Sequence, residues 1–268
     1  HRRFATVALR RHLPTRPRAR VRSRALPAHW DETTDQDDIS ARVEAMRCMQ
    51  ELGLDPMPPS RNLMDLELGI ARCQEAQSEE MEGHCAPEQL EFLRGFVAKH
   101  FGSAGRPIRM CQIGFNAGHS AAALLEHAPE GSVLLSLDKG NHTYTRPLEQ
   151  VVQRMALDRG QTHFLLEGDS AEMLPRFRNI DFDLVFIDGN HAYEAVKLDL
   201  WNFMLLSSKR TVLLVNHIFT NMVEGDGPTR VWLEAMREGH AEQRGWHSCC
   251  SRHGIAVGAV TQPWRKGD

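Results

Sequence analysis

From residue 108 onward, short apolar runs alternate with segments of helical spacing. The apolar runs lie at residues 108–113, 133–137, 163–166, 184–187 and 212–215, and the helical segments at 118–128, 144–157, 170–177 and 191–206. Strands that are apolar on both faces and joined by helices form a parallel sheet that is covered on both sides. Because such crossovers are right-handed, the pattern predicts a doubly wound α/β fold.

The end of the chain departs from this alternation. Residues 246–250 and 254–260 have the character of two short strands, joined by a turn at residues 251–253. A tight turn makes such a pair antiparallel. We therefore predict a seven-stranded, mostly parallel sheet that finishes in an antiparallel hairpin, an ending unlike that of dinucleotide-binding dehydrogenases.

Helical spacing also precedes the first predicted strand. Apolar residues favour helices over residues 36–54 and 62–79, and a third helix is expected to start near Pro87, since proline suits the first turn. These helices are expected to pack on, or cap, the sheet. We predict three parts: a leader (residues 1–30), N-terminal helices on the substrate side (residues 31–80) and the α/β domain (residues 81–268).

Charge is distributed unevenly along the chain. The leader holds nine Arg and no acidic residue, whereas the other 238 residues hold 23 basic and 35 acidic side chains. The leader has too few apolar residues to build a core. It resembles a transit peptide for an organelle, but a tail for an acidic partner or a disordered segment without a role fits the same composition. We accordingly expect a cytoplasmic protein, or an organellar one if the leader is a transit peptide.

Composition excludes several classes of protein. No apolar run approaches the 18 residues of a membrane span, so no membrane partner is expected. The acidic body lacks the basic face of a nucleic-acid binder, so no nucleic-acid partner is expected either. Six Cys in 268 residues form no CxxC pair and are not a disulfide framework, which indicates structural thiols in a reducing compartment.

Polar residues follow the predicted strands at one edge of the sheet. The first strand runs into a loop with Gly114 and Gly118, which permit a tight turn and a close backbone approach to a ligand. The next three strands end near Asp138, Asp169 and Asp188. In an open α/β sheet the ligand lies at these carboxyl ends, and a carboxylate after the second strand suits ribose hydroxyls. For Asp138 or Asp169 alone, helix N-capping is the competing interpretation.

These segments resemble a known family, the class I S-adenosylmethionine-dependent methyltransferases. The resemblance covers about residues 81–263 and rests on MCQIGFNAGHSAAALL, LLSLD, LLEGDSAEMLP, FDLVFIDGNHAYEAVKLDL and GIAVGAVTQP. It is strongest to the small-molecule O-methyltransferase branch, which includes catechol and caffeoyl-CoA methyltransferases and the methyltransferase domain 24 group. The resemblance implies a Rossmann-like methyltransferase fold, S-adenosylmethionine as cofactor and a small-molecule acceptor methylated on a hydroxyl oxygen. A homodimer is one assembly that we consider.

The resemblance also implies cofactor-binding roles. The methionine part of the cofactor would lie against Gly114, Asn116, Gly118 and Ser120, and Gln112 is a further candidate cofactor-binding residue. Asp138 would hold the ribose, Asp169 and Ser170 would face the adenine, and Asp188 would be a cofactor-side carboxylate. Family members usually keep Glu or Asp at the position of Gln112. Since a carboxamide still donates and accepts hydrogen bonds, this change need not abolish binding.

The implied catalytic residues are Asp188, His191 and His217. His191 stands where the metal-dependent branch keeps a Lys as general base, and histidine suits that role near neutral pH. Asn216 and His217 stand where it keeps a second Asp and an Asn, so Asp188, Asn216 and His217 are the candidate ligands for a divalent ion such as Mg²⁺. Neutral ligands make a weak Mg²⁺ site, and His217 could serve a softer metal or act as a base.

Two other functions stay open. The changes at Gln112 and Asn216 fit a methyltransferase-like protein that binds or regulates without efficient catalysis. A different nucleotide-binding enzyme, such as a dehydrogenase, is disfavoured because the GxGxxG fingerprint is absent. The acceptor itself cannot be read from the helices before the first strand or from the segment 217–228, which is expected to be a loop.

Overall fold

The computed structural model describes residues 47, 49–54, 57–58, 60–77, 81, 85–177, 180–218, 223–249 and 253–261. The chain divides into two units, His1–Thr34 and Asp35–Asp268, and all described residues belong to the second. The leader therefore lies outside the described residues, as does much of the helix predicted over residues 36–54. Residues 49–51 of that helix are described and are helical.

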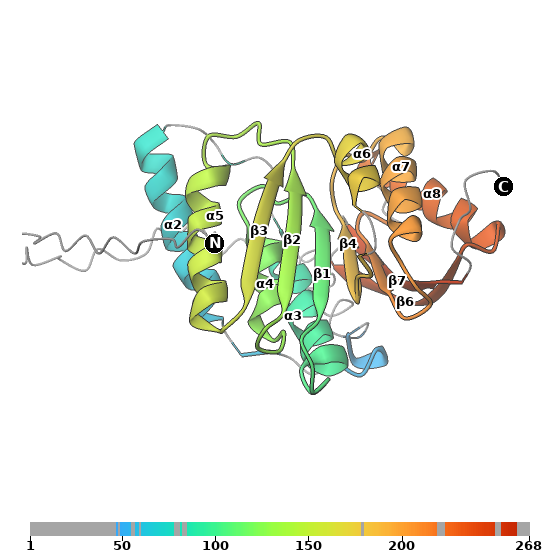
Figure 1. Cartoon of the computed structure of the whole chain (residues 1–268), viewed down its shortest axis with the longest axis horizontal. Coiled ribbons are helices and arrows are strands. Elements are labelled where there is room, and N and C mark those ends of the chain that lie inside the picture. The colour runs from blue at the N-terminus through green and yellow to red at the C-terminus, as the bar shows by residue number, and fades with distance from the viewer. Residues whose placement is uncertain are drawn as a thin grey trace, which may run out of the picture. The chain divides into compact units, whose positions relative to one another are not determined.

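A seven-stranded sheet forms the centre of the second unit, in the order β3-β2-β1-β4-β5-β7-β6 (Figure 1). The strands are β1 (Arg109–Ile113), β2 (Val133–Asp138), β3 (Thr162–Glu167), β4 (Leu184–Ile187), β5 (Val212–Val215), β6 (Ala241–Cys249) and β7 (His253–Val260). Strands β1–β5 pair with one another in parallel, whereas β7 runs antiparallel to both β5 and β6. The predicted doubly wound sheet with a terminal hairpin is confirmed.

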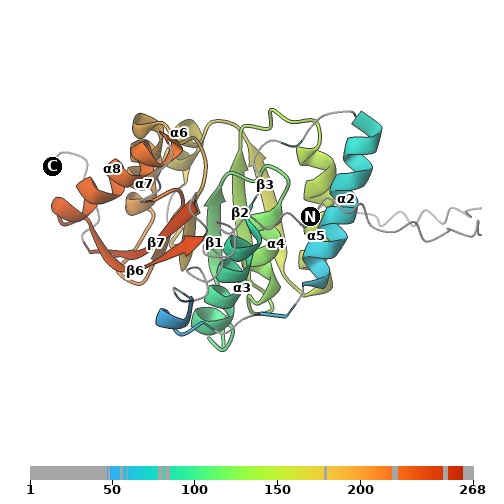
Figure 2. The same cartoon turned by 180° about the vertical axis from the view of Figure 1, so that it is seen from behind.

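Helices lie on both sides of this sheet. They are α2 (Arg61–Gln77), α3 (Pro87–Phe101), α4 (His119–Glu126), α5 (Thr145–Asp158), α6 (Ser170–Met173), α7 (Tyr193–Leu205) and α8 (Asp226–Arg237), with short 3₁₀ helices at Leu174–Arg176 and Val223–Gly225. Figures 1 and 2 show α3, α4 and α5 on one side, with α2 packed against α5, and α6, α7 and α8 on the other side near β4, β5 and β7.

Two parts of this architecture differ from the sequence prediction. The segment 217–228 is not only a loop, because α8 begins within it at Asp226. Gly227 and Pro228 near its start disfavour a helix prediction from the sequence. The helix is stabilised by burial of Val231 and Trp232 against the sheet. Strand β6 begins at residue 241 rather than 246, because a register shift between Gln243 and Gly245 interrupts the alternation by which the strand would be recognised.

The core has two layers, one on each face of the sheet. Along β1, Met110 belongs to the layer shared with α3 and α4, whereas Cys111 belongs to the layer shared with α7 and α8. Strand β4 repeats this alternation with Phe186 and Ile187. Both faces are therefore buried in the middle of the sheet, which explains why the strands read as continuous apolar runs.

A buried ion pair joins α3 and α4 on one side of the sheet. Arg94 on α3 donates from Nε and Nη2 to the two oxygens of Glu126 on α4, over 3.0 and 2.8 Å. The same guanidinium donates to the carbonyl of Pro58 over 2.6 Å, and the Ser60 hydroxyl also donates to Glu126. These bonds connect α3, α4 and the start of α2 into one rigid layer.

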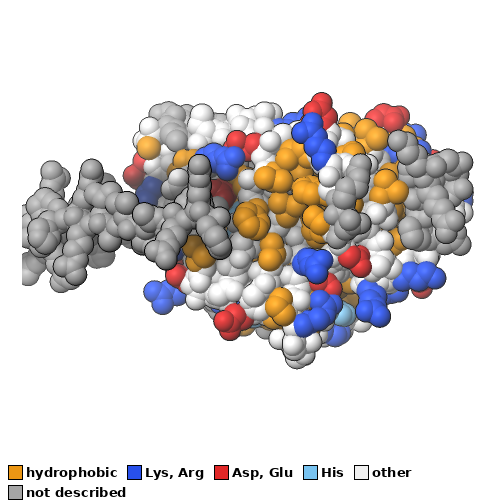
Figure 3. Space-filling view, viewed as in Figure 1, with side chains coloured by type: hydrophobic (Ala, Val, Ile, Leu, Met, Phe, Trp, Pro, Cys, Tyr) orange, Lys and Arg blue, Asp and Glu red, His pale blue; other side chains and the backbone are white. Residues whose placement is uncertain are grey.

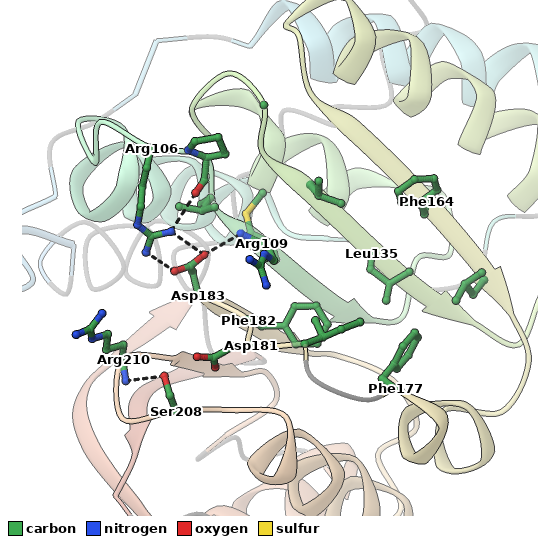
Figure 4. A pocket seen from close by; sticks show the side chains of 17 residues that line it. Arg106, Arg109, Leu135, Phe164, Phe177, Asp181, Phe182, Asp183, Ser208 and Arg210 are labelled. Atoms are coloured by element: carbon green, nitrogen blue, oxygen red, sulfur yellow. Dashed lines mark hydrogen bonds and ion pairs between the residues drawn. The ribbon is translucent and has the colours of Figure 1, made fainter.

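The opposite face of β1–β3 is open. Figure 3 shows hydrophobic side chains gathered there, and Phe164 is 51% exposed. A hollow of about 880 Å³ lies on this face and around the amino ends of β1 and β4 (Figure 4). Charged residues that line the hollow bond to one another. The Asp183 carboxylate accepts two hydrogen bonds from the Arg106 guanidinium, over 2.5 and 3.2 Å, and one from the Arg109 backbone N–H over 2.8 Å. Within the described part of the chain, no helix is long and apolar enough to cross a bilayer.

Candidate functional site

A second cavity, of about 550 Å³, lies at the carboxyl ends of β1, β4 and β5. It is lined by Met81, Cys85, Gln89, Gly114, Phe115, Asn116, Ala117, His119, Ser120, Asp188, His191, Asn216 and His217. This is the end of an open α/β sheet at which ligands bind. Although smaller than the hollow on the open sheet face, this cavity gathers polar and titratable groups that are directed at a common space.

Two glycines shape the loop after β1. Gly114 has φ 89°, and a Cβ atom there would lie 2.1 Å from the backbone oxygen of Asp188. Gly118 has φ 92° and precedes α4, and a Cβ there would lie 2.9 Å from both Phe115 and Val152. Only glycine therefore allows the loop to pass this close to the end of β4, as expected of a loop that approaches a ligand.

Asp138, at the end of β2, fixes this loop. Its Oδ2 accepts the backbone N–H groups of Phe115 and Asn116 over 2.8 and 2.9 Å, and its Oδ1 accepts that of Gly140 over 2.8 Å. The Tyr144 hydroxyl donates to Asn116 Oδ1 over 2.6 Å. The carboxylate thus orders the loop before any ligand binds, and its Oδ1 keeps capacity for a further donor.

Gln112 lies directly before the loop and is fully buried. Its side-chain nitrogen and oxygen have no hydrogen-bond partner among the described residues. A buried amide without partners costs about 1–3 kcal/mol. Such a group is expected where a ligand or an ordered water supplies the missing bonds.

Asp169 and Ser170 do not line the cavity. Asp169 is exposed and caps α6, where its carboxylate accepts the Ala171 N–H over 2.9 Å. The Ser170 hydroxyl donates to Asp199 over 2.6 Å, and burial raises the pKa of Asp199 to about 6. The N-cap interpretation of Asp169 describes the structure, while the adenine-facing role of both residues stays a prediction.

A cluster of one carboxylate, one amide and two imidazoles forms the opposite wall. Asn216 Nδ2 donates to Asp188 Oδ1 over 2.7 Å, and His217 Nε2 lies 3.4 Å from the same oxygen. The rings of His191 and His217 are 3.9 Å apart between centroids. The structure confirms that Asp188 faces Asn216 and His217, because β4 and β5 are adjacent parallel strands that end together.

The pKa values of Asp188 and His191 in this cluster are shifted from their ordinary values. Burial alone would raise the pKa of Asp188, but the bonds from His217 and Asn216 lower it below its usual range. Burial, with the neighbouring His217, lowers the pKa of His191 below its ordinary value. At neutral pH the cluster therefore combines an ionised carboxylate with a neutral His191 whose nitrogen lone pair is free to accept a proton or bind a metal.

Backbone strain is concentrated at this site. Among the described residues other than glycine, only Asn116 (φ 50°) and His217 (φ 59°) have positive φ. Both line the cavity. Such conformations cost on the order of 1 kcal/mol or more and tend to persist at functional sites. The fold thus maintains two strained residues in the lining of the same cavity.

Several residues that line or support the site could not be identified from the sequence. Met81, Cys85 and Gln89 reach the cavity from α3 and the segment before it. Burial and the charge of Asp188 raise the pKa of the Cys85 thiol. Gly227 on α8 packs against the loop of His191, since a Cβ there would lie 2.1 Å from the His191 backbone oxygen. Only the fold brings these distant segments together.

Comparison with known proteins agrees with this arrangement. Residues 111–218 match the family model described as a methyltransferase domain, of the domain 24 group. No curated protein matches the chain. A presumed O-methyltransferase from Klebsiella pneumoniae superposes with a TM-score of 0.62 at 18% identity, over 85% of this chain and 100% of the other. An O-methyltransferase from Bacillus cereus in complex with S-adenosylhomocysteine gives 0.58 at 15% identity, over 82% and 99%.

A third solved structure extends the comparison. The O-methyltransferase TomG from Streptomyces achromogenes, which acts in tomaymycin synthesis and is bound to S-adenosylmethionine, has a TM-score of 0.58 at 15% identity, over 85% of this chain and 100% of the other. At such identities the likeness concerns the fold. The family match and the fold agree with the resemblance drawn from the sequence motifs. Residues 111–218 match the methyltransferase-domain family model, and the described part of the chain has the fold of class I S-adenosylmethionine-dependent methyltransferases.

Proposed function

We propose that this protein transfers the methyl group of S-adenosylmethionine to a hydroxyl oxygen of a small-molecule acceptor. The observation that carries the proposal is the cavity in which the glycine loop after β1 faces the cluster of Asp188, His191 and His217. One wall has the geometry of a cofactor loop, and the other supplies groups that take up a proton. The cavity, of about 550 Å³, has the size of a small-molecule site.

The residues present fit the cofactor. Gln112 presents a buried amide without partners, Ser120 lines the cavity at the start of α4, and Asp138 keeps a free acceptor position beside the loop. Gln112 and Ser120 suit the methionine part of the cofactor, and Asp138 suits the ribose. When bound, S-adenosylmethionine supplies an electrophilic methyl group. The protein contributes orientation, which provides much of the rate in a displacement between two bound molecules.

Proton removal is the second requirement. A hydroxyl becomes a good nucleophile when a base takes its proton as the methyl group is transferred. In the protein without bound metal, His191 is neutral at pH 7 and lies in the cavity beside His217, so we assign the proton to this imidazole pair. Asp188, which Asn216 holds in place, stabilises the positive charge that the pair acquires.

Calorimetric titration tests the proposal against its alternatives. S-adenosylmethionine should bind, whereas NAD should not, and a panel of hydroxylated acceptors should then give turnover. Binding of S-adenosylmethionine without turnover on any acceptor would favour the regulatory alternative. Binding of NAD in place of S-adenosylmethionine would remove the methyltransferase proposal.

Asp138 is expected to be decisive for cofactor binding. The substitution Asp138→Ala removes the acceptor for the ribose and the two bonds that order the loop at Phe115 and Asn116. At about 1.5–3 kcal/mol for each bond to a charged group, less compensation by water, S-adenosylmethionine should bind about 2–4 kcal/mol more weakly. The Kd from calorimetry should rise about 30- to 1000-fold. Asp181→Ala, at the hollow on the open sheet face, is the control and should leave the Kd unchanged.

The imidazole pair should determine the pH dependence of turnover in chelator-treated protein. Because the pKa of His191 is lowered, the rate should fall on acidification with a midpoint below the ordinary 6.5. His191→Ala should remove this acidic limb of the pH–rate profile and lower kcat about 100-fold or more. His100→Ala, on α3 outside the cavity, should retain the limb. An unchanged profile in both His191→Ala and His217→Ala would show that the proton goes elsewhere.

A further inference from the structure

The donor atoms around Asp188 do not match the metal that the family resemblance implies. Mg²⁺ prefers anionic and water oxygens in octahedral geometry. Here one carboxylate, Asp188, is accompanied by the imidazoles of His191 and His217, and the ligand atoms of these three residues lie within 4.8 Å of one another. Imidazole nitrogen suits Zn²⁺, Fe²⁺, Co²⁺ and Ni²⁺ rather than Mg²⁺. The chain therefore does not fit a Mg²⁺ site.

We propose that Asp188, His191 and His217 form a site for a divalent transition-metal ion of the zinc class. The three ligands comprise two histidines and one carboxylate, the composition of open metal sites that keep further positions for water or substrate. The candidate set drawn from the sequence, Asp188, Asn216 and His217, changes accordingly. His191 replaces Asn216 as the third ligand.

The spacing of the ligand atoms supports this assignment. Bonds of about 2.0–2.1 Å in tetrahedral geometry place two ligand atoms roughly 3.3–3.5 Å apart. His217 Nε2 and Asp188 Oδ1 are 3.4 Å apart. The ligand atom of His191 lies within 4.8 Å of those of His217 and Asp188, and the two imidazole rings are 3.9 Å apart between centroids.

Asn216 takes the role of a supporting residue. Its Nδ2 donates to Asp188 Oδ1 over 2.7 Å, which holds the carboxylate in position. Its own oxygen is buried and lacks a hydrogen-bond partner within the described part of the chain, on a residue that is only 3% exposed. Metal-binding carboxylates are commonly held by such neighbours, whose loss weakens metal binding about 10- to 100-fold.

The backbone of His217 is a further indication. With φ 59° it is strained, and this conformation brings the imidazole to the same oxygen that Asn216 holds. Two imidazoles at this distance repel each other when both are protonated, whereas a metal ion would bind both imidazoles and balance the carboxylate charge. Bound metal and a proton on His191 exclude each other, which is why the pH profile above is measured after chelation.

The experiment uses the full chain, freed of metal by a chelator and titrated with Co²⁺ in the absence of S-adenosylmethionine and acceptor. We expect the visible absorption of four-coordinate Co²⁺ at one equivalent, its loss on addition of Zn²⁺, and no change with a large excess of Mg²⁺. His191→Ala and His217→Ala should each weaken Co²⁺ binding at least 10-fold. His100→Ala should not weaken it.

Two further variants keep the result interpretable. Asp188→Asn preserves the shape of the ligand and should also weaken binding at least 10-fold, even if an alanine variant fails to fold. Cys85→Ser should leave the Co²⁺ spectrum unchanged, since the proposed ligands do not include this thiol. Displacement of Co²⁺ by Mg²⁺, or equal binding by the His100→Ala and His217→Ala proteins, would overturn the proposal.

The outcome is separable from the proposed function. Absence of the Co²⁺ spectrum in a protein that still binds S-adenosylmethionine would remove the metal site and leave the methyltransferase proposal standing. A Co²⁺ spectrum in a protein that does not bind S-adenosylmethionine would do the reverse.

Discussion

Replacing Arg94 with alanine should lower the free energy of unfolding by about 3–5 kcal/mol, because it leaves a carboxylate buried without its ionic partner. Arg94 is 5% exposed and donates two hydrogen bonds to Glu126 and one to the carbonyl of Pro58. The remaining Ser60 hydroxyl cannot neutralise the charge, and neither can His127, whose Nε2 lies 3.5 Å from Glu126 Oε1 but whose pKa is lowered by burial. Urea denaturation at pH 7.5 measures the change as a lower midpoint with an unchanged slope.

An exposed ion pair provides the control for this measurement. Arg106 bonds Asp183 with both terminal nitrogens, but its side chain is 58% exposed. Since exposed pairs contribute about 0–1 kcal/mol, Arg106→Ala should change stability by no more than that. The double variant Arg94→Ala, Glu126→Gln should recover part of the loss, because it also removes the stranded charge. A loss below 1 kcal/mol for Arg94→Ala would show that Glu126 reaches water.

The sheet could be predicted from sequence because β1, β4 and β5 are largely buried on both faces, and because β2 and β3, although open on one face, still carry mostly apolar residues. The helical spacing between these runs fixes the parallel order. The same reasoning failed at α8 and at β6. Helix α8 starts at a Gly-Pro pair that interrupts its helical spacing, and β6 is an edge strand with a register shift between Gln243 and Gly245.

The candidate site was predictable only in part. Motifs at the ends of β1 and β4 identify Gly114 and Asp188, and the parallel topology places Asn216 and His217 beside Asp188. Sequence spacing cannot show the contact between the rings of His191 and His217, which depends on loop geometry. Cys85 also escaped prediction, because its segment enters the cavity from 29 residues before the glycine loop.

Acidification should destabilise the protein through two buried histidines. His163 hydrogen-bonds Ser136 over 2.8 Å, and His247 stacks on Phe92 with 4.5 Å between ring centroids. Burial lowers the pKa of each to about 4. In the unfolded chain both imidazoles take up a proton near pH 6.5, whereas in the native protein they stay neutral down to about pH 4. The free energy of unfolding is therefore unaffected by these histidines above pH 6.5, and it decreases as the pH falls from 6.5 to about 4.

The expected loss at pH 5 is about 2 kcal/mol for each histidine, at 1.36 kcal/mol for each pH unit below 6.5. Asp199 acts in the opposite sense, since its raised pKa of about 6 makes the native protein take up a proton first. The histidine contribution is therefore read from variants by urea denaturation at pH 7.5 and 5.0. His163→Asn and His247→Leu should each reduce the pH-dependent loss by about 2 kcal/mol, whatever they cost at pH 7.5. Asp199→Asn should instead enlarge it. If both histidine variants lose as much stability as the parent on acidification, the two imidazoles are protonated in the native protein.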